Sequence, residues 1–262
     1  MIFNIRATAG AFKQQALHFF ADPQWVIPSL IAPFVFTVVT LMIFQDSDGP
    51  VVLYAVLGGG ILGMWGNTLY SSSWSINFDR FNGTIEPLMI SPTPLMQVVA
   101  GRTFWNALLG LLNALLVFVI AELAFQADVR IADPLLFFVA LVATIVSLAL
   151  IGLMFSALFV LTRTSFVFTR MLEFPIYVAC GAMFPLALLP EWTLSFSYIL
   201  APSWGVDALR IASLDGYQTT GLGYIGDILM IVVLCSFYLL IAIHLYRRME
   251  KRALIAGTLG RY

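Results

Sequence analysis

Charged residues are scarce in this sequence: they make up only 10% of the 262 residues, whereas soluble domains contain about 25%. Hydrophobic residues make up 61%, against about 45–50% in a soluble domain. This composition excludes an ordinary water-soluble fold. The 13 basic and 14 acidic residues nearly cancel, so the net charge of -1 gives no overall field that attracts nucleic acid or an anionic partner.

The sequence also lacks the patterns of a catalytic or nucleotide-binding site. His18 and His244 lie at opposite ends of the chain, outside the His-Glu-x-x-His spacing that binds zinc. No serine lies in a Gly-x-Ser-x-Gly turn, and no glycine-rich loop followed by Lys and Ser or Thr is present to hold a nucleotide phosphate. Cys180 and Cys235 lie within apolar runs, which favours packing roles. We therefore expect no catalytic residues, no metal and no cofactor on this chain.

Long apolar runs are what the sequence does contain. A helix needs about 20 mostly apolar residues to cross the hydrocarbon core of a bilayer, and six runs meet this requirement. The predicted fold is an all-α integral membrane protein with six transmembrane helices, at about 23–44, 51–77, 97–121, 134–161, 171–189 and 224–246. The predicted organisation is an N-terminal amphipathic interfacial helix over 1–22, a six-span domain over 23–246 and a short cytoplasmic tail over 247–262.

The first segment has the apolar spacing of an amphipathic helix. Its basic polar face, opposite phenylalanine and leucine, suits the headgroup boundary of a membrane, and the same pattern also fits a helix packed on protein. The residues that repeat at spacings of three and four are Ile5, Ala9, Phe12, Ala16 and Phe19.

The segment over 192–220 mixes aromatic, polar and proline residues, so it is neither a clean span nor a hydrophilic loop. We predict short re-entrant helices at the outer interface, where aromatic rings are favoured. Asp207 and Arg210 lie three residues apart and are expected to pair with each other or with a neighbour, helping to close an outer gate. Simple solvation is the alternative for these two residues.

The distribution of Lys and Arg predicts the orientation, because cytoplasmic loops retain basic residues near the span ends. With both termini in the cytoplasm, only Arg130 and Arg210 fall on the outer side. The basic residues that fall on the cytoplasmic side are Arg6, Lys13, Arg80, Arg102, Arg163, Arg170, Arg247, Arg248, Lys251, Arg252 and Arg261.

The polar loop over 77–94 stands out among the connections. Gly83 permits a sharp turn, and Thr84 is placed to cap a short helix whose first turn carries Glu86, beside the positive end of the helix dipole. On these grounds alone, a solvated loop is the simpler interpretation.

This loop resembles the Glu-Arg-x-x-Gly-Thr-x-Glu-x-Leu-x-x-x-Pro pattern of the type-2 ABC exporter permease family, whose members include bacterial drug, polysaccharide and lipid exporters. Asp79 stands where glutamate is commoner. A second stretch, which includes Leu189-Pro190-Glu191-Trp192 and Ala201-Pro202, is similar to the outer re-entrant region of the family, although Ser203-Trp204 departs from it. The residues that fit the first pattern are Arg80, Gly83, Thr84, Glu86, Leu88 and Pro92.

The resemblance implies a permease that moves an amphipathic or lipid-like substrate (a drug, lipid or glycan) out of the cytoplasm. It implies a dimer with a second permease copy or paralogue in a prokaryotic plasma or inner membrane, with cytosolic ABC ATPase subunits that carry the ATP and Mg. The residues that it implies couple to the ATPase are Asp79, Arg80, Gly83, Thr84, Glu86 and Leu88.

Other polar groups and other functions remain open on sequence alone. The loop over 163–170 is a further candidate cytosolic contact, or merely a basic loop. A secondary transporter or a membrane enzyme that acts without an ATPase is the alternative function, and neither an internal repeat nor a catalytic cluster supports it. The second span carries polar residues that line a translocation path or bond to adjacent helices: Asn67, Thr68, Tyr70, Ser71 and Ser72.

Overall fold

The computed structural model places α-helices, and no strand, in the part of the chain that it describes. The helices are α1 (Ile5–Ala21), α4 (Ile85–Ile90), α5 (Leu95–Phe125), α6 (Pro134–Val160), α8 (Glu191–Ile199), α9 (Ala201–Ser213) and α10 (Tyr224–Ala256). The described residues are 4–23, 56–61, 63–64, 68, 78–79, 81–125, 131–160, 175–176, 178–182, 189–214, 216–217, 219 and 221–256, with single positions between 26 and 42 and at 171 and 186.

Three of the helices are long and apolar enough to cross a membrane: α5, α6 and α10. Their qualifying stretches contain 29, 24 and 28 residues, so they are about 36–44 Å long, against a hydrocarbon core of about 30 Å. They match the third, fourth and sixth predicted spans. The predicted first, second and fifth spans fall largely outside the described residues, so the count of six stays a prediction.

The helix boundaries follow the local sequence signals. Pro134 begins α6, as the Asp133-Pro134 pair predicts. In contrast, α10 extends well beyond Tyr246, so residues 247–256 of the predicted tail continue this helix. The segment predicted to lie at the outer interface contains two short helices, α8 and α9, as predicted, while its outer location and re-entrant character stay predictions.

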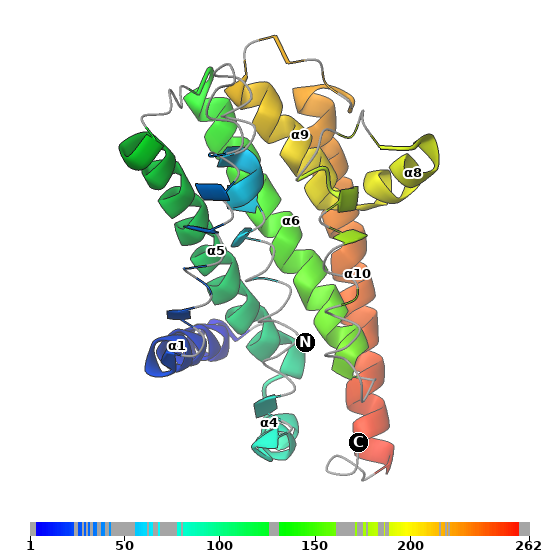
Figure 1. The fold of residues 1–262 in the computed structure, drawn as a ribbon. Coiled ribbons are helices and arrows are strands. Elements are labelled where there is room, and N and C mark those ends of the chain that lie inside the picture. Colours follow the sequence, from blue (N-terminus) through cyan, green and yellow to red (C-terminus); the bar gives the residue numbers. More distant parts are fainter. Residues whose placement is uncertain are drawn as a thin grey trace.

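The long helices stand side by side, with α6 in contact with both α5 and α10 (Figure 1). At one end of this layer lie α4, α1 and the C-terminal end of α10, and at the other end lie α8 and α9 (Figure 1). Helix α9 packs against α6 and α10. The contact is close, because a Cβ atom at Gly205 would lie within 3.1 Å of the Thr144 side chain.

Helix α1 packs one face against α5 and leaves another face exposed. Phe19 lies in a buried cluster with Trp105 and Leu109 of α5. Ile5 and Phe20, in contrast, are 72% and 65% exposed. The helix predicted from the sequence is therefore confirmed, and it is packed on protein along one face. Its exposed apolar side chains leave the other face suited to a lipid interface.

Small residues bring the helices close together. A Cβ atom at Gly110 of α5 would lie 2.7 Å from the Cα atom of Met64, and one at Gly58 would lie 2.6 Å from the carbonyl oxygen of Ala182. The glycine-rich second span therefore makes the close helix contacts that its composition predicts.

We expect Gly101→Ala to loosen the packing of α1 on α5. A Cβ atom at Gly101 would lie 2.3 Å from the carbonyl oxygen of Thr8, so α1 must move away. The predicted destabilisation is about 1–3 kcal/mol, the usual cost of overpacking, measured as a lower thermal unfolding midpoint of the purified protein. Gly10→Ala is the matched control, because a Cβ atom there meets nothing within 4 Å. Equal midpoints for the two variants would contradict the tight contact.

Candidate functional site

The turn that precedes α4 is set by glycine. Gly83 has a φ angle of 67°, in the left-handed region that glycine adopts without steric cost. The turn is closed by two backbone hydrogen bonds, from Asn82 N to Phe78 O (3.0 Å) and from Thr84 N to Asp79 O (2.8 Å). The sharp turn predicted at Gly83 is therefore confirmed. It directs the chain into α4 at the end of the bundle (Figure 1).

A buried ion pair connects this turn to α5. Arg102 Nη1 lies 2.5 Å from Asp79 Oδ2, and Arg102 Nη2 lies 3.3 Å from Asp79 Oδ1. The two side chains are 3% and 7% exposed, respectively. Charges in such a setting cost free energy unless they are paired and hydrogen-bonded. The pair therefore fixes the turn before α4 to α5.

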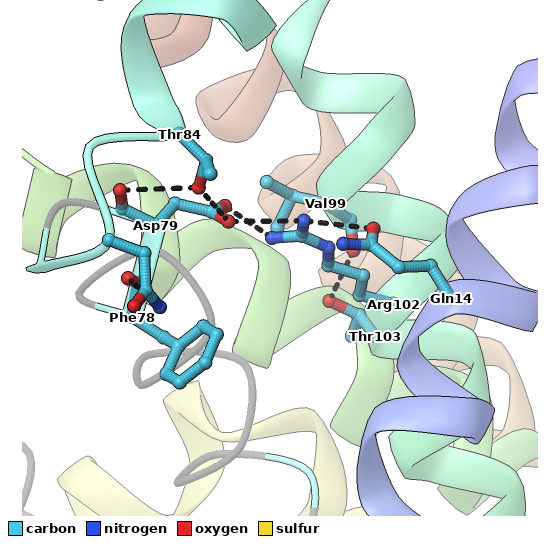
Figure 2. Close-up of polar contacts among 8 residues, drawn as sticks. Gln14, Phe78, Asp79, Thr84, Val99, Arg102 and Thr103 are labelled. Carbon is cyan, nitrogen blue, oxygen red and sulfur yellow. Dashed lines mark hydrogen bonds and ion pairs between the residues drawn. The ribbon is translucent and has the colours of Figure 1, made fainter.

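Two further side chains complete the group around the ion pair, which Figure 2 shows between α1, α5 and the turn. Arg102 Nη2 donates to Gln14 Oε1 of α1 at 3.0 Å. The hydroxyl of Thr84 lies 3.0 Å from Asp79 Oδ1 and 3.3 Å from Asp79 O. We call Gln14, Asp79, Thr84 and Arg102 the charge cluster. It joins three segments that are distant in sequence.

The structure corrects one detail of the sequence interpretation. Thr84 occupies the N-cap position of α4, as predicted, but its side chain makes no capping hydrogen bond. The hydroxyl bonds to Asp79 instead, because the preceding turn brings that carboxylate closer than the free backbone groups of α4.

Apolar packing anchors one side of α4, and the other side is exposed. Ile85 is 6% exposed and belongs to a cluster with Leu95 and Val99 of α5, Leu153 of α6 and Tyr246 of α10, and Leu88 packs against it. Phe81 and Ile90 are 81% and 77% exposed. Helix α4 thus contributes Ile85 to a core that residues of all three long helices share, while Ile90, at its end, and Phe81, before the Gly83 turn, remain exposed.

Polar contacts also join α5, α6 and α10 to one another near α4. Glu250 Oε1 of α10 accepts from the backbone N–H of Leu95, at the start of α5, at 3.0 Å. Ser156 of α6 and Tyr246 of α10 share a buried hydrogen bond of 2.8 Å between their hydroxyls. These bonds tie the ends of α5, α6 and α10 together where α4 is anchored.

Some of the predicted coupling residues fall within this site and others fall outside the described residues. Asp79, Gly83, Thr84 and Leu88 lie in or beside the cluster and the α4 anchor. Arg80 is outside the described residues. Glu86 has its backbone in the first turn of α4, and its side chain is outside the description.

Sequence reasoning missed the roles of Gln14 and Arg102. It used Arg102 only as a marker of orientation and assigned no role to Gln14. The available signal was an arginine inside an otherwise apolar run, because such a charge is costly unless it has a partner.

At the opposite end of the bundle, the predicted gate residues are buried and bind neighbouring groups. Arg210 Nη2 donates to Gly181 O at 2.6 Å and to Ala182 O at 3.4 Å, where a helical turn ends. Asp207 accepts hydrogen bonds from the hydroxyls of Tyr217 (2.9 Å) and Thr219 (2.5 Å). These bonds hold α9 against the segments on either side of it.

Of the predicted path residues, the structure describes Thr68. It is 1% exposed, and its hydroxyl donates to Met64 O at 2.8 Å, a bond within its own helix. Asn67, Tyr70, Ser71, Ser72 and the loop over 163–170 lie outside the described residues. Among the described residues, no group of three or more His, Cys, Asp or Glu side chains is placed to hold a metal ion.

Comparison with protein families matches residues 8–214 to the family described as ABC-2 type transporter. The match covers well over half of the 262 residues and reaches from α1 to the end of α9. No curated protein matches the chain in sequence. The chain belongs to the ABC-2 type transporter family and is the transport membrane subunit of an ABC transporter.

Proposed function

We propose that this chain is the permease subunit of an ATP-driven exporter and that a separate ABC ATPase subunit drives it through α4. Membership of the family supports the role of membrane subunit. The observation that carries the ATPase contact is the exposure of Phe81, in the turn before α4, and of Ile90, at the end of α4, at 81% and 77%. They lie beside Ile85, which belongs to a core shared by the three long helices. Large apolar side chains at such exposure favour burial against a partner protein.

Force applied to α4 has two routes into the membrane helices. The apolar route runs from Ile85 and Leu88 to α5, α6 and α10. The polar route runs from Asp79 to Arg102 of α5 and on to Gln14 of α1. A displaced α4 therefore moves α5 and α1 with it, because separation would leave a buried charge unpaired. Arg80 and Glu86 are assigned to the ATPase contact by their fit to the family pattern.

The outer end responds by releasing α9. In this proposal, Asp207 and Arg210 form an outer gate, and an outward-opening movement breaks their bonds to the loop at 217–219 and to the turn at 181–182. ATP and Mg are bound by the ATPase partner, and the energy reaches this end through α6 and α10, on which α9 packs.

The cargo that we propose is amphipathic or lipid-like: a drug, lipid or glycan. The apolar and aromatic composition supports this class of substrate. The transporter is a dimer with a second permease, in a prokaryotic plasma or inner membrane. The arrangement of α1, α4 and the C-terminal end of α10 at one end of the bundle supports cytoplasmic termini on the side of the ATPase (Figure 1).

Replacement of the exposed apolar side chains next to the ATPase tests the proposal. We expect Phe81→Glu and Ile90→Glu to abolish co-purification of the cognate ABC ATPase subunit, because a desolvated carboxylate disfavours an apolar contact. Leu222→Glu is the matched control, since Leu222 is 67% exposed at the other end of the bundle. If the three variants retain the ATPase equally, or if the wild-type chain does not bind it, the proposed coupling through α4 is wrong.

The charge cluster gives a second prediction. Asp79→Asn or Arg102→Gln alone should destabilise the chain by about 3–5 kcal/mol, because each leaves the other charge buried and unpaired. The double variant should cost less than the sum of the two single variants, since no buried charge remains. Thermal unfolding midpoints of the purified chain measure the stability of each variant. The ATP hydrolysis rate of the complex measures how well each variant remains coupled to the ATPase subunit. Additive effects on stability would show that the two side chains do not act as a pair.

A further inference from the structure

Buried polar atoms without a hydrogen-bond partner are concentrated on α5. Within the described residues, most such side-chain atoms belong to this one helix. They are three donors, which are Arg102 Nε, Trp105 Nε1 and Asn106 Nδ2, and one acceptor, which is Asn113 Oδ1. The two asparagines are each 1% exposed. A buried polar group left without a partner loses its hydrogen bonds to water and gains none in return, so this concentration needs an explanation.

These residues lie along one side of the helix. At about 100° per residue, Arg102, Asn106 and Asn113 fall within about 40° of one another, and they span about 16 Å along the axis. We call these three residues, with Trp105, the polar seam. It begins at the charge cluster, beside α4, and runs toward the middle of α5.

The polar seam faces the N-terminal elements of the chain. Gln15 of α1 donates to Asn106 Oδ1 at 3.4 Å, and Asn113 Nδ2 donates to the carbonyl oxygen of Ser29 at 2.9 Å. The ring of Trp105 contacts Phe12 edge to face, with centroids 5.4 Å apart. The seam is therefore a boundary between α5 and two segments, α1 and the chain near Ser29, and each asparagine of the seam makes one polar bond across it.

Stability alone does not account for the asparagines. Leucine has a similar volume and would fill both positions without leaving an amide atom unpaired in an apolar setting. Each asparagine instead uses one end of its amide group and leaves the other end buried without a partner. A buried group of this kind calls for an explanation, and a ligand that binds it in another state of the protein is one that fits both asparagines.

The charge of the seam limits the class of ligand. Arg102 is neutralised by Asp79, and the remaining groups of the seam are uncharged. A charged headgroup would therefore find no compensating charge there, whereas hydroxyl, ester or amide groups would find both donors and an acceptor.

We propose that the polar seam binds the uncharged, hydrogen-bonding headgroup of an amphiphile that enters between α5 and α1. The apolar chain of the amphiphile lies against lipid-exposed side chains of α5 such as Leu112 and Leu116, which are 46% and 44% exposed.

Cysteine labelling tests whether the seam opens. The purified Asn106→Cys and Asn113→Cys variants are reconstituted in lipid nanodiscs, in which the reagent reaches both faces of the membrane. Each variant is then treated with a charged, membrane-impermeant methanethiosulfonate. Ala107→Cys and Ala114→Cys are matched controls, because these sequence neighbours are buried at nearly the same depth on another side of α5. The wild-type chain, with both of its cysteines buried, gives the background. We expect the asparagine positions to react and the alanine positions to stay at background. Equal labelling of the two sets, or no labelling, overturns the proposal.

Two amphiphiles with the same dodecyl chain test the headgroup class. Dodecyl maltoside carries an uncharged headgroup rich in hydroxyls, and dodecyltrimethylammonium carries a cationic headgroup that has no donor. Below their micellar concentrations, we expect the maltoside to slow labelling of Asn106→Cys about tenfold, the effect of one net hydrogen bond. Equal protection by both compounds, or by neither, overturns the headgroup assignment.

ATP distinguishes the two sources of such a headgroup, which are exported cargo and bilayer lipid. With the ATPase partner present, turnover should remove protection by the maltoside if the seam carries cargo, whereas a resident lipid site keeps it. This last arm rests on the proposed function. The labelling without ATPase does not, so failure of the seam and failure of the ATPase coupling give different results.

Discussion

The buried ion pair between Asp79 and Arg102 is the interaction on which the arrangement of this protein depends. It lies where the turn before α4, the first turns of α5 and the helix α1 meet, and it bonds to all three. Because an unpaired charge at this site would cost several kcal/mol, the three elements stay together or separate together. The ion pair thereby links α4, a short helix at the edge of the molecule, to the long helix α5.

The ion pair also determines the net charge of the polar seam on α5. Because Asp79 neutralises Arg102, the polar seam beyond the pair is uncharged and offers only neutral hydrogen-bonding groups. The same helix, α5, therefore carries both the contact that receives movement from α4 and the groups that we assign to an amphiphile. A movement of α5 would change both at once, which links energy input to ligand binding without a long pathway.

Local signals in the sequence predicted much of the fold. The Asp133-Pro134 pair located the start of α6, Gly83 located the sharp turn, and apolar runs located α5 and α10, because each of these features depends on nearby residues or on composition alone. The family pattern predicted that the segment around Asp79 couples to the ATPase, and this role stays a prediction. The C-terminal extension of α10 was not foreseen, since its basic residues indicate a span end and not a helix end.

The partners within the site required the three-dimensional structure. Asp79 and Arg102 are 23 positions apart, and Gln14 is 88 positions from Arg102, so no periodicity joins them. Thr84 was expected to cap its own helix, and only the geometry of the turn shows that Asp79 is closer. Asn106 and Asn113 were hidden within an apolar run, because their importance lies in the partners that their amide atoms lack.

The most direct measurement is the distance between spin labels on α4 and α1 in the complex with the ATPase, with and without trapped ATP. Labels at Pro87→Cys of α4 and Leu17→Cys of α1 use exposed side chains that the account does not place in the ATPase contact, and the native cysteines Cys180 and Cys235 are buried. The account predicts one narrow distance distribution that ATP leaves unchanged, and a broader distribution when Arg102→Gln is added. An ATP-dependent change of this distance in the wild-type background, or no effect of Arg102→Gln, would contradict transmission through the ion pair.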